Sequence, residues 1–121
     1  MYDLIICTKG DEIMLDVNFE FVRGILFVRL EGKINYDSIS TINNSLTDVI
    51  KKGGIKYLVF NVTNAVIEER VSMFDECNLL IKENGGKMYM CGLKNKLETI
   101  VSDSCEKITN ELLAFNKIRL C

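Results

Sequence analysis

The stretch IKYLVFNVTNAVIEERVSMF, residues 55–74, decides the fold that this sequence predicts. Its first part, residues 55–62, is a nearly continuous apolar run rich in β-branched and aromatic residues, as in a strand buried on both faces. From Met73 onward, apolar residues recur at helical spacing. The segment between them leaves the carboxyl end of the strand, where α/β proteins commonly carry their function. We therefore take this loop as the first candidate site.

Paired glycines divide the middle of the chain into repeated helix-to-strand passages. The two passages read IKKGGIKY at residues 50–57 and IKENGGKMY at residues 81–89. Such spacing is typical of βαβ crossovers in a parallel sheet. We interpret the glycines as helix stops, since neither the G-x-G-x-x-G nor the G-x-x-x-x-G-K-[ST] phosphate-binding motif occurs. Lys51 and Lys52 add cations at the negative end of the first of these helices.

Hydrophobic periodicity predicts the elements around these passages. Upstream, we expect a short strand at 2–7 and an antiparallel hairpin of strands 13–22 and 25–31, turning at Arg23–Gly24. A helix capped by Asp37 or Ser38 should follow. Its predicted apolar face consists of Ile39, Ile42, Leu46, Val49 and Ile50. The next helix and strand are expected at 73–81 and 87–92, with Phe60, Phe74, Met88 and Met90 in the core.

The C-terminal region allows two interpretations. Apolar spacing from Leu97 to Leu112 fits one long amphipathic helix over about residues 94–114, with NKIRLC, residues 116–121, as a last edge strand. A break near Asp103–Ser104 into two shorter helices is the alternative.

Composition limits the functional classes. The 121 residues are one domain's worth of chain, 48% hydrophobic and 26% charged, with no proline or low-complexity linker. The net charge is −2 and the positive charges are scattered, which argues against a nucleic-acid surface. No apolar run is long enough for a membrane span or a signal-peptide core. We expect a single cytoplasmic domain over residues 1–121.

Cysteine and histidine content narrows the chemistry further. The five cysteines are widely spaced without a C-x-x-C pair, and the chain contains no histidine. We therefore expect reduced, mostly buried thiols, no metal site and no cofactor. Without histidine, the usual general base and the usual partner of a Ser or Cys nucleophile are missing, so we expect no enzymatic activity.

Three phrases of the sequence resemble the STAS domain, the fold of bacterial anti-sigma factor antagonists. They are VRLEGKINYDSISTINNSL at 28–46, GGIKYLVFNVTNA at 53–65 and GGKMYMCGL at 85–93, and the similarity runs over about residues 13–101. In the family, a strand ends in a phrase like L-x-G-E-L-D and a later strand reads like I-V-L-D/N-L. LEGKIN (30–35) and YLVFNV (57–62) occupy those places. The resemblance implies a mixed sheet with an N-terminal antiparallel hairpin and helices mainly on one face.

This chain departs from the family pattern in the candidate loop. The family carries D-S-[ST]-G there, whose serine or threonine a partner anti-sigma kinase phosphorylates. This chain instead has IEERVSM at 67–73, with neither an Asp-Ser pair nor a glycine, and Asn35 replaces the acid of the earlier phrase. Ser72 is thus the candidate phosphorylation site. The pattern Ser72-x-x-Asp75 also predicts a capping box for the next helix, and the two roles are compatible.

The resemblance also implies a partner-binding surface made of two loops. One loop holds Asn35, Tyr36 and Ser38, and the other holds Glu68, Glu69, Arg70 and Ser72. Glu68 and Glu69 either lie in a solvated loop or supply permanently the negative charge of a phosphoserine. Arg70 is expected to bridge to one of these glutamates or to an acid of the partner. Asn35 and Ser38 fit a cap or turn equally well.

The implied function is regulation of transcription by partner switching. The chain would bind an ATP-binding anti-sigma factor or a similar protein, without the usual serine phospho-switch; whether it forms a homodimer is open. The alternative is a carrier of a small ligand, either a nucleotide or an apolar molecule held between sheet and helices. An enzyme with Glu68 or Glu69 as general base would require a buried carboxylate with a raised pKa.

Overall fold

The computed structural model describes residues 2–9, 12–93 and 105–119, of which the side chains are described from Met14 onward. Six strands form one sheet in the order of the chain: β1 (Tyr2–Lys9), β2 (Glu12–Val22), β3 (Ile25–Ile34), β4 (Tyr57–Ile67), β5 (Lys87–Cys91) and β6 (Glu106–Ile108). The pairs β1·β2 and β2·β3 are antiparallel, and the pairs from β3 to β6 are parallel. The predicted mixed α/β fold is therefore confirmed.

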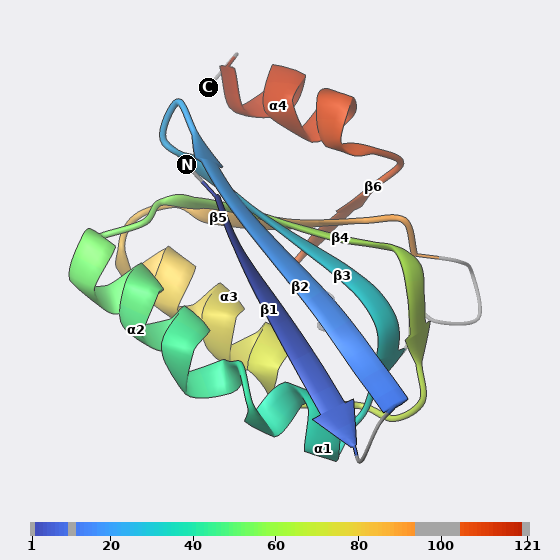
Figure 1. The fold of residues 1–121 in the computed structure, drawn as a ribbon. Helices are drawn as coiled ribbons and strands as arrows, with labels where there is room; N and C mark the ends of the chain where they lie inside the picture. Colours follow the sequence, from blue (N-terminus) through green and yellow to red (C-terminus); the bar gives the residue numbers. More distant parts are fainter. Residues whose placement is uncertain (1, 10–11, 94–104, 120–121) are drawn as a thin grey trace.

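The helices cover the sheet unequally (Figure 1). They are α1 (Tyr36–Ser40), α2 (Asn43–Gly53), α3 (Met73–Glu83) and α4 (Glu111–Arg119). The first three pack over one face and enclose the larger apolar core, whereas α4 covers a smaller core on the other face. Among the described residues, no helix is long and apolar enough to cross a membrane.

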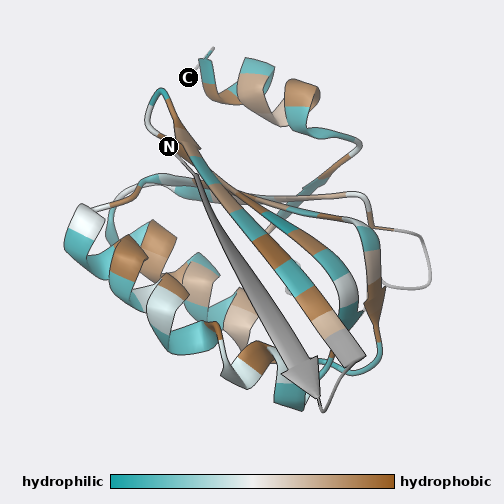
Figure 2. Ribbon diagram, viewed as in Figure 1, coloured by the Kyte–Doolittle hydropathy of each residue, from teal (hydrophilic) through white to brown (hydrophobic). Residues whose placement is uncertain are grey.

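Burial along the strands follows from these layers. Leu58, Val59 and Phe60 of the central strand β4 are all fully buried because helices lie on both sides of them. Along β2, by contrast, hydrophobic and polar residues alternate (Figure 2). The alternation weakens toward the hairpin turn, where Phe21 is 47% exposed although it is an even number of residues from the buried Leu15 and Val17.

The predicted core residues are confirmed. Phe60, Phe74, Met88 and Met90 are at most 2% exposed. The rings of Phe60 and Phe74 meet edge to face with centroids 5.0 Å apart, a favourable arrangement that ties α3 to the centre of the sheet.

The glycine-rich helix ends also behave as predicted. Gly54 adopts a left-handed conformation with φ +58°, and its N–H donates to the carbonyls of Ile50 and Lys51 at the end of α2. Gly86 has a further role, because a Cβ built there would lie 1.6 Å from the carbonyl oxygen of Lys56. Only glycine allows the α3–β5 connection to approach the chain before β4 so closely.

Two predicted boundaries in the middle of the chain were wrong. The expected helix to Ile50 breaks at Thr41–Ile42 into α1 and α2. Val49 is 48% exposed although Leu46 and Ile50 of the same helix are buried, so Val49 lies outside the buried face of α2. Strand β4 continues to Ile67, five residues past the expected end, by pairing with the whole of β3. One extra residue in β4 between Asn61 and Asn64 forms a bulge, which periodicity along one strand does not reveal.

The prediction for the C-terminal region was also wrong where the structure describes it. Residues 94–104 and 120–121 lie outside the described residues. Residues 106–108 form strand β6 rather than part of a long helix, because the open edge of β5 offers backbone hydrogen bonds to them. Residues 116–119 belong to helix α4, not to an edge strand. Ile118 lies on the buried side of that helix, in the smaller core.

Candidate functional site

The parallel pairing of β3 and β4 places the two predicted partner-binding loops side by side. Ile34 pairs with Ile67 at the carboxyl ends of the two strands. Beyond that pair, the N–H of Glu68 donates to the carbonyl of Ile34 over 2.9 Å. Residues 33 positions apart in the sequence therefore meet at one edge of the sheet.

Two carboxylates then join the loops. The Nδ2 of Asn35 donates to Oε1 of Glu68 over 2.8 Å, and the backbone N–H of Tyr36 donates to Oε1 of Glu69, also over 2.8 Å. Tyr36 is the first residue of α1, so the Glu69 carboxylate lies at the positive end of that helix. Glu68 is exposed and Glu69 half-buried. Both glutamates thus act as acceptors within the chain, a role that sequence reasoning did not predict.

Asn35, rather than Asp37 or Ser38, is the N-cap of α1. Its Oδ1 accepts from the N–H of Ser38 over 2.9 Å, and its own N–H donates to Oγ of Ser38 over 3.1 Å. The Ser38 hydroxyl also donates to the carbonyl of Lys33 over 2.8 Å. Ser38 is only 1% exposed, so it shapes the loop from inside instead of offering a side chain at the surface.

The predicted capping box at Ser72 was wrong. Ser72 occupies the N-cap position of α3, but its side chain makes no capping hydrogen bond. Its backbone is helical (φ −74°, ψ −15°), whereas a capping side chain needs an extended backbone to reach the first-turn amides. Asp75 instead pairs with Arg70, with Nη2 and Oδ2 2.8 Å apart. Ser72 itself is exposed.

Two apolar side chains stand out beside these polar groups. Tyr36 is 64% exposed and Val66 61% exposed, although the buried strand ends Ile34 and Ile67 lie within two residues of them. Val66 was missed because the strand was expected to end before it; the β-branched pair Val66–Ile67 was the available signal. We call Tyr36, Val66, Glu68, Glu69, Arg70 and Ser72 the loop surface.

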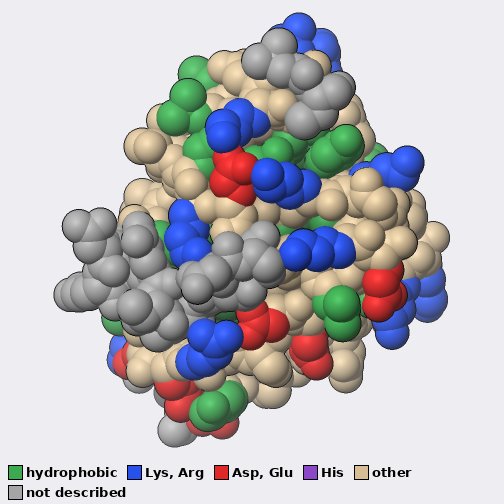
Figure 3. All heavy atoms as spheres, turned by 180° about the vertical axis from the view of Figure 1, so that it is seen from behind, with side chains coloured by type: hydrophobic (Ala, Val, Ile, Leu, Met, Phe, Trp, Pro, Cys, Tyr) green, Lys and Arg blue, Asp and Glu red, His purple; other side chains and the backbone are tan. Residues whose placement is uncertain are grey.

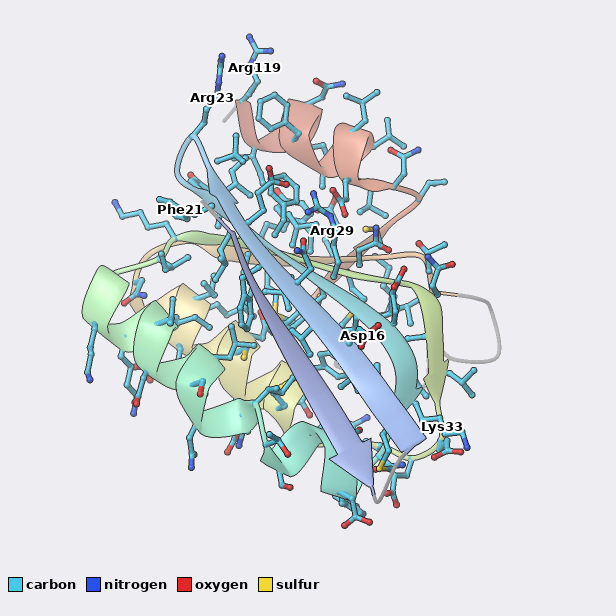
Figure 4. The ribbon with its side chains drawn as sticks, in the orientation of Figure 1. Asp16, Phe21, Arg23, Arg29, Lys33 and Arg119 are labelled. Carbon is cyan, nitrogen blue, oxygen red and sulfur yellow. The ribbon has the colours of Figure 1, made fainter. Side chains whose placement is uncertain are left out.

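A second polar cluster lies on the opposite face of the sheet, beneath α4. The guanidinium of Arg29, labelled in Figure 4, donates from Nε and Nη2 to both oxygens of Glu111 at 2.8 Å. Asn61 donates to the same carboxylate over 2.8 Å. Burial alone would raise the pKa of Glu111, but the hydrogen bonds from Arg29 and Asn61 lower it overall. This cluster holds α4 against the sheet, and no sequence motif indicated it.

The described charges on the back of the molecule are mixed in sign. Lys and Arg side chains are spread over the back of the molecule among Asp and Glu (Figure 3). Glu106 of β6 pairs with both Lys87 and Lys117, and these bonds lower its pKa.

The buried thiols match the sequence prediction. Cys77, Cys91 and Cys105 are free and buried. Burial raises the pKa of Cys77 and Cys91 to about 12 and that of Cys105 to about 11. These thiols are protonated and unreactive at neutral pH. Within the described part of the chain, no group of three His, Cys, Asp or Glu residues could hold a metal ion.

Comparison with known proteins agrees with this fold. The model of the family described as STAS domain matches residues 16–105. The unphosphorylated form of the anti-sigma factor antagonist SpoIIAA is 14% identical, covers 85% of this chain and 97% of its own, and superposes with a TM-score of 0.68. The phosphorylated form of SpoIIAA from Bacillus is 13% identical, covers 85% and 99%, and gives a TM-score of 0.68.

A third similar structure is a serine-to-glutamate variant of RsbS from Moorella thermoacetica. It is 17% identical, covers 84% of this chain and 96% of its own, and has a TM-score of 0.65. At such identities these structures establish the shared fold, not a shared partner.

Proposed function

This chain belongs to the STAS domain family, and on that premise we propose that it is a non-enzymatic regulator resembling an anti-sigma factor antagonist. Its partner would be an ATP-binding anti-sigma factor or a similar regulator, bound in the cytoplasm of a bacterium. Binding would release whatever protein the partner otherwise holds. No chemical step on this chain is needed for that activity.

The observation that carries the proposal is the joining of the two loops. Three hydrogen bonds connect them: Glu68 N–H to Ile34, Asn35 to Glu68, and Tyr36 N–H to Glu69. A loop surface that is already ordered loses less conformational entropy when a partner binds. The exposed Tyr36 and Val66 flank the carboxylates and supply apolar contact area, as the anchors of protein interfaces do.

The same contacts support a binding state that is independent of serine phosphorylation. Glu68 and Glu69 hold negative charge at this edge of the sheet permanently, whereas a phosphoserine would add about −1.5 to −2 units only when formed. Because each carboxylate also accepts a hydrogen bond from the neighbouring loop, the charge and the loop conformation are linked. We propose that this link keeps the module in a single partner-binding state.

Ser72 remains the candidate for a modified switch. Its hydroxyl is exposed and takes no part in helix capping. A phosphate at that position would be favoured by the N-terminus of α3 but repelled by the nearby acids Asp75 and Glu76 in the first turn.

The test is a pull-down from native lysate with ATP and magnesium, followed by mass spectrometry of the retained proteins and of the bait. We expect an ATP-binding regulator to be retained and the bait to carry no added phosphate. With the partner in hand, Glu68→Gln/Glu69→Gln would remove the charge but keep the acceptor oxygens, and Glu83→Gln, an exposed site at the end of α3, is the matched control.

Three results test the role of permanent charge, the phosphorylation of Ser72 and the location of the partner surface. Unchanged affinity of the Glu68→Gln/Glu69→Gln variant would eliminate the role of permanent charge. An added phosphate that is lost in the Ser72→Ala variant would show that Ser72 is phosphorylated and would support a phospho-switch. Unchanged affinity of Tyr36→Ala and of Val66→Ser would place the partner surface elsewhere and contradict the proposal.

A further inference from the structure

A cavity of about 460 Å³ opens at the end of the molecule opposite the loop surface. It is bounded by the β2–β3 turn, the connection from α2 to β4, and the last turn of α4. These segments adjoin the amino ends of β3 and β4, whereas the loop surface adjoins their carboxyl ends. Figure 4 shows Phe21, Arg23 and Arg119 at this end, with Lys33 at the other. The volume lies in the range of small-molecule sites.

The cavity combines aromatic walls with basic groups. Its apolar side includes Phe21, which is 47% exposed, together with Tyr57 and Phe115. Arg119 lies over the ring of Phe115, with 5.6 Å from the guanidinium carbon to the ring centroid. Such walls suit an apolar body, and the arginine adds positive charge beside it.

No acidic side chain that the structure describes neutralises the basic groups of the cavity. Arg23, Lys56 and Arg119 line it, and none of the described lining residues is acidic. In the described part of the chain these three cations form no ion pair, unlike Arg29 and Arg70, which are bound to carboxylates. The whole chain carries a net charge of −2, so a lining of cations alone makes this cavity locally attractive to an anion.

The backbone at Arg23 provides a separate observation. Arg23 and Gly24 form a two-residue hairpin turn in which both φ angles are positive, at +52° and +83°. Asn, Asp or Gly is favoured at the first of these positions, and another residue type such as Arg costs stability there. Arg23 makes no hydrogen bond or ion pair in the described structure that would repay this cost.

We propose that this cavity binds a small amphipathic anion with a single carboxylate or phosphate group. The acidic group lies among Arg23, Lys56 and Arg119, and the apolar body lies against Phe21 and Phe115. The site is separate from the loop surface, so the chain can hold this ligand whether or not a protein partner is bound.

The first experiment titrates the isolated chain with decanoate, decyl phosphate and decyltrimethylammonium, all below micelle formation, and follows backbone amide signals by NMR. We expect saturable binding of both anions, with shifts centred on Arg23, Lys56 and Arg119, and much weaker binding of the cation. Equal binding of the cation, or shifts centred elsewhere, would overturn the proposal. Binding to anionic lipid vesicles without binding of the monomeric anions would also overturn it, in favour of a membrane contact.

Substitutions make the second test. Arg23→Asn should raise the unfolding midpoint, since Asn suits the turn, yet weaken anion binding about three- to tenfold. Lys56→Gln should weaken binding by a similar factor, whereas Lys82→Gln, an exposed lysine near the end of α3, is the control. Unchanged anion affinity in both cavity variants would refute the site. The assay contains no protein partner, so its outcome is independent of the proposed function.

Discussion

The side-chain amide of Asn35 donates to the carboxylate of Glu68 over 2.8 Å and so connects the two loops of the surface. STAS sequences commonly carry an acid where this chain has Asn35. Asparagine can donate a hydrogen bond to Glu68, whereas a carboxylate there would repel it. The two departures from the family pattern, Asn35 and the acidic loop, are therefore complementary to each other.

This complementarity can be measured. Asn35→Asp should preserve the cap of α1, because Asp also accepts from the Ser38 amide, but should lower the unfolding free energy by about 1 kcal/mol through repulsion of Glu68. Adding Glu68→Gln should recover most of that loss, since Gln removes the like charge. Chemical denaturation of both single variants and the double variant gives the coupling energy. A coupling energy near zero would mean that the contact does not stabilise the loops.

The buried side of α4 provides a prediction about pH. Glu111→Gln should lower the unfolding free energy by about 1–3 kcal/mol at pH 7, because the bidentate bond to Arg29 loses its charge. The pKa of Glu111 is lowered by folding, so the carboxylate stabilises the fold above its ordinary value of 4.5, and this contribution is lost as the pH falls below it.

Urea unfolding of wild type and Glu111→Gln between pH 3 and pH 7 checks this expectation. The difference between the two proteins should shrink toward acid pH, while Glu83→Gln should follow wild type throughout. A difference that is constant with pH would assign the effect of Glu111 to packing instead of charge.

Gly86 offers a prediction about close backbone contact. Gly86→Ala should destabilise the protein by about 3 kcal/mol or more, because its Cβ would collide with the carbonyl of Lys56, which is backbone and cannot rotate away. Gly53→Ala is the matched control. The nearest atom there is 3.3 Å away, at the end of the flexible Ile55 side chain, and Ala is a better helix former. Similar thermal midpoints for the two variants would contradict the close approach of Gly86 to Lys56.

The raised pKa values of the thiols predict slow thiol–disulfide exchange in the native protein. In a Cys7→Ser/Cys121→Ser background, Cys77, Cys91 and Cys105 should react with a disulfide reagent at pH 8 only after denaturant is added. The unfolded thiols ionise near their ordinary pKa of 9.0, below the folded values of about 11 to 12, so folding stability should fall as the pH rises above about 9. Rapid labelling of the native protein would show that the thiols are accessible.

The sequence by itself determined the order of the central elements. The apolar run at 55–62 and the paired glycines specify a buried strand between helices, because burial on both faces requires continuous apolar residues and glycine commonly ends a helix. The hydrophobic spacing within one such element depends only on residues close together in the sequence, so the sequence is enough to predict the element. The candidate residues Asn35, Tyr36, Glu68 and Glu69 came from the resemblance to the STAS family and from their place in loops that follow strands.

Only the tertiary structure decided what these residues do. Glu69 binds the amide of Tyr36 across 33 positions, Glu111 binds Arg29 across 82, and Arg23 faces a cavity completed by the last helix. Strand β6 and the helix break at Thr41 likewise depend on neighbouring elements. β6 pairs with the free edge of β5, and the break lets α1 and α2 both pack on the sheet. Periodicity describes the two faces of one element, whereas these contacts depend on strand register and on the packing of segments far apart in the chain.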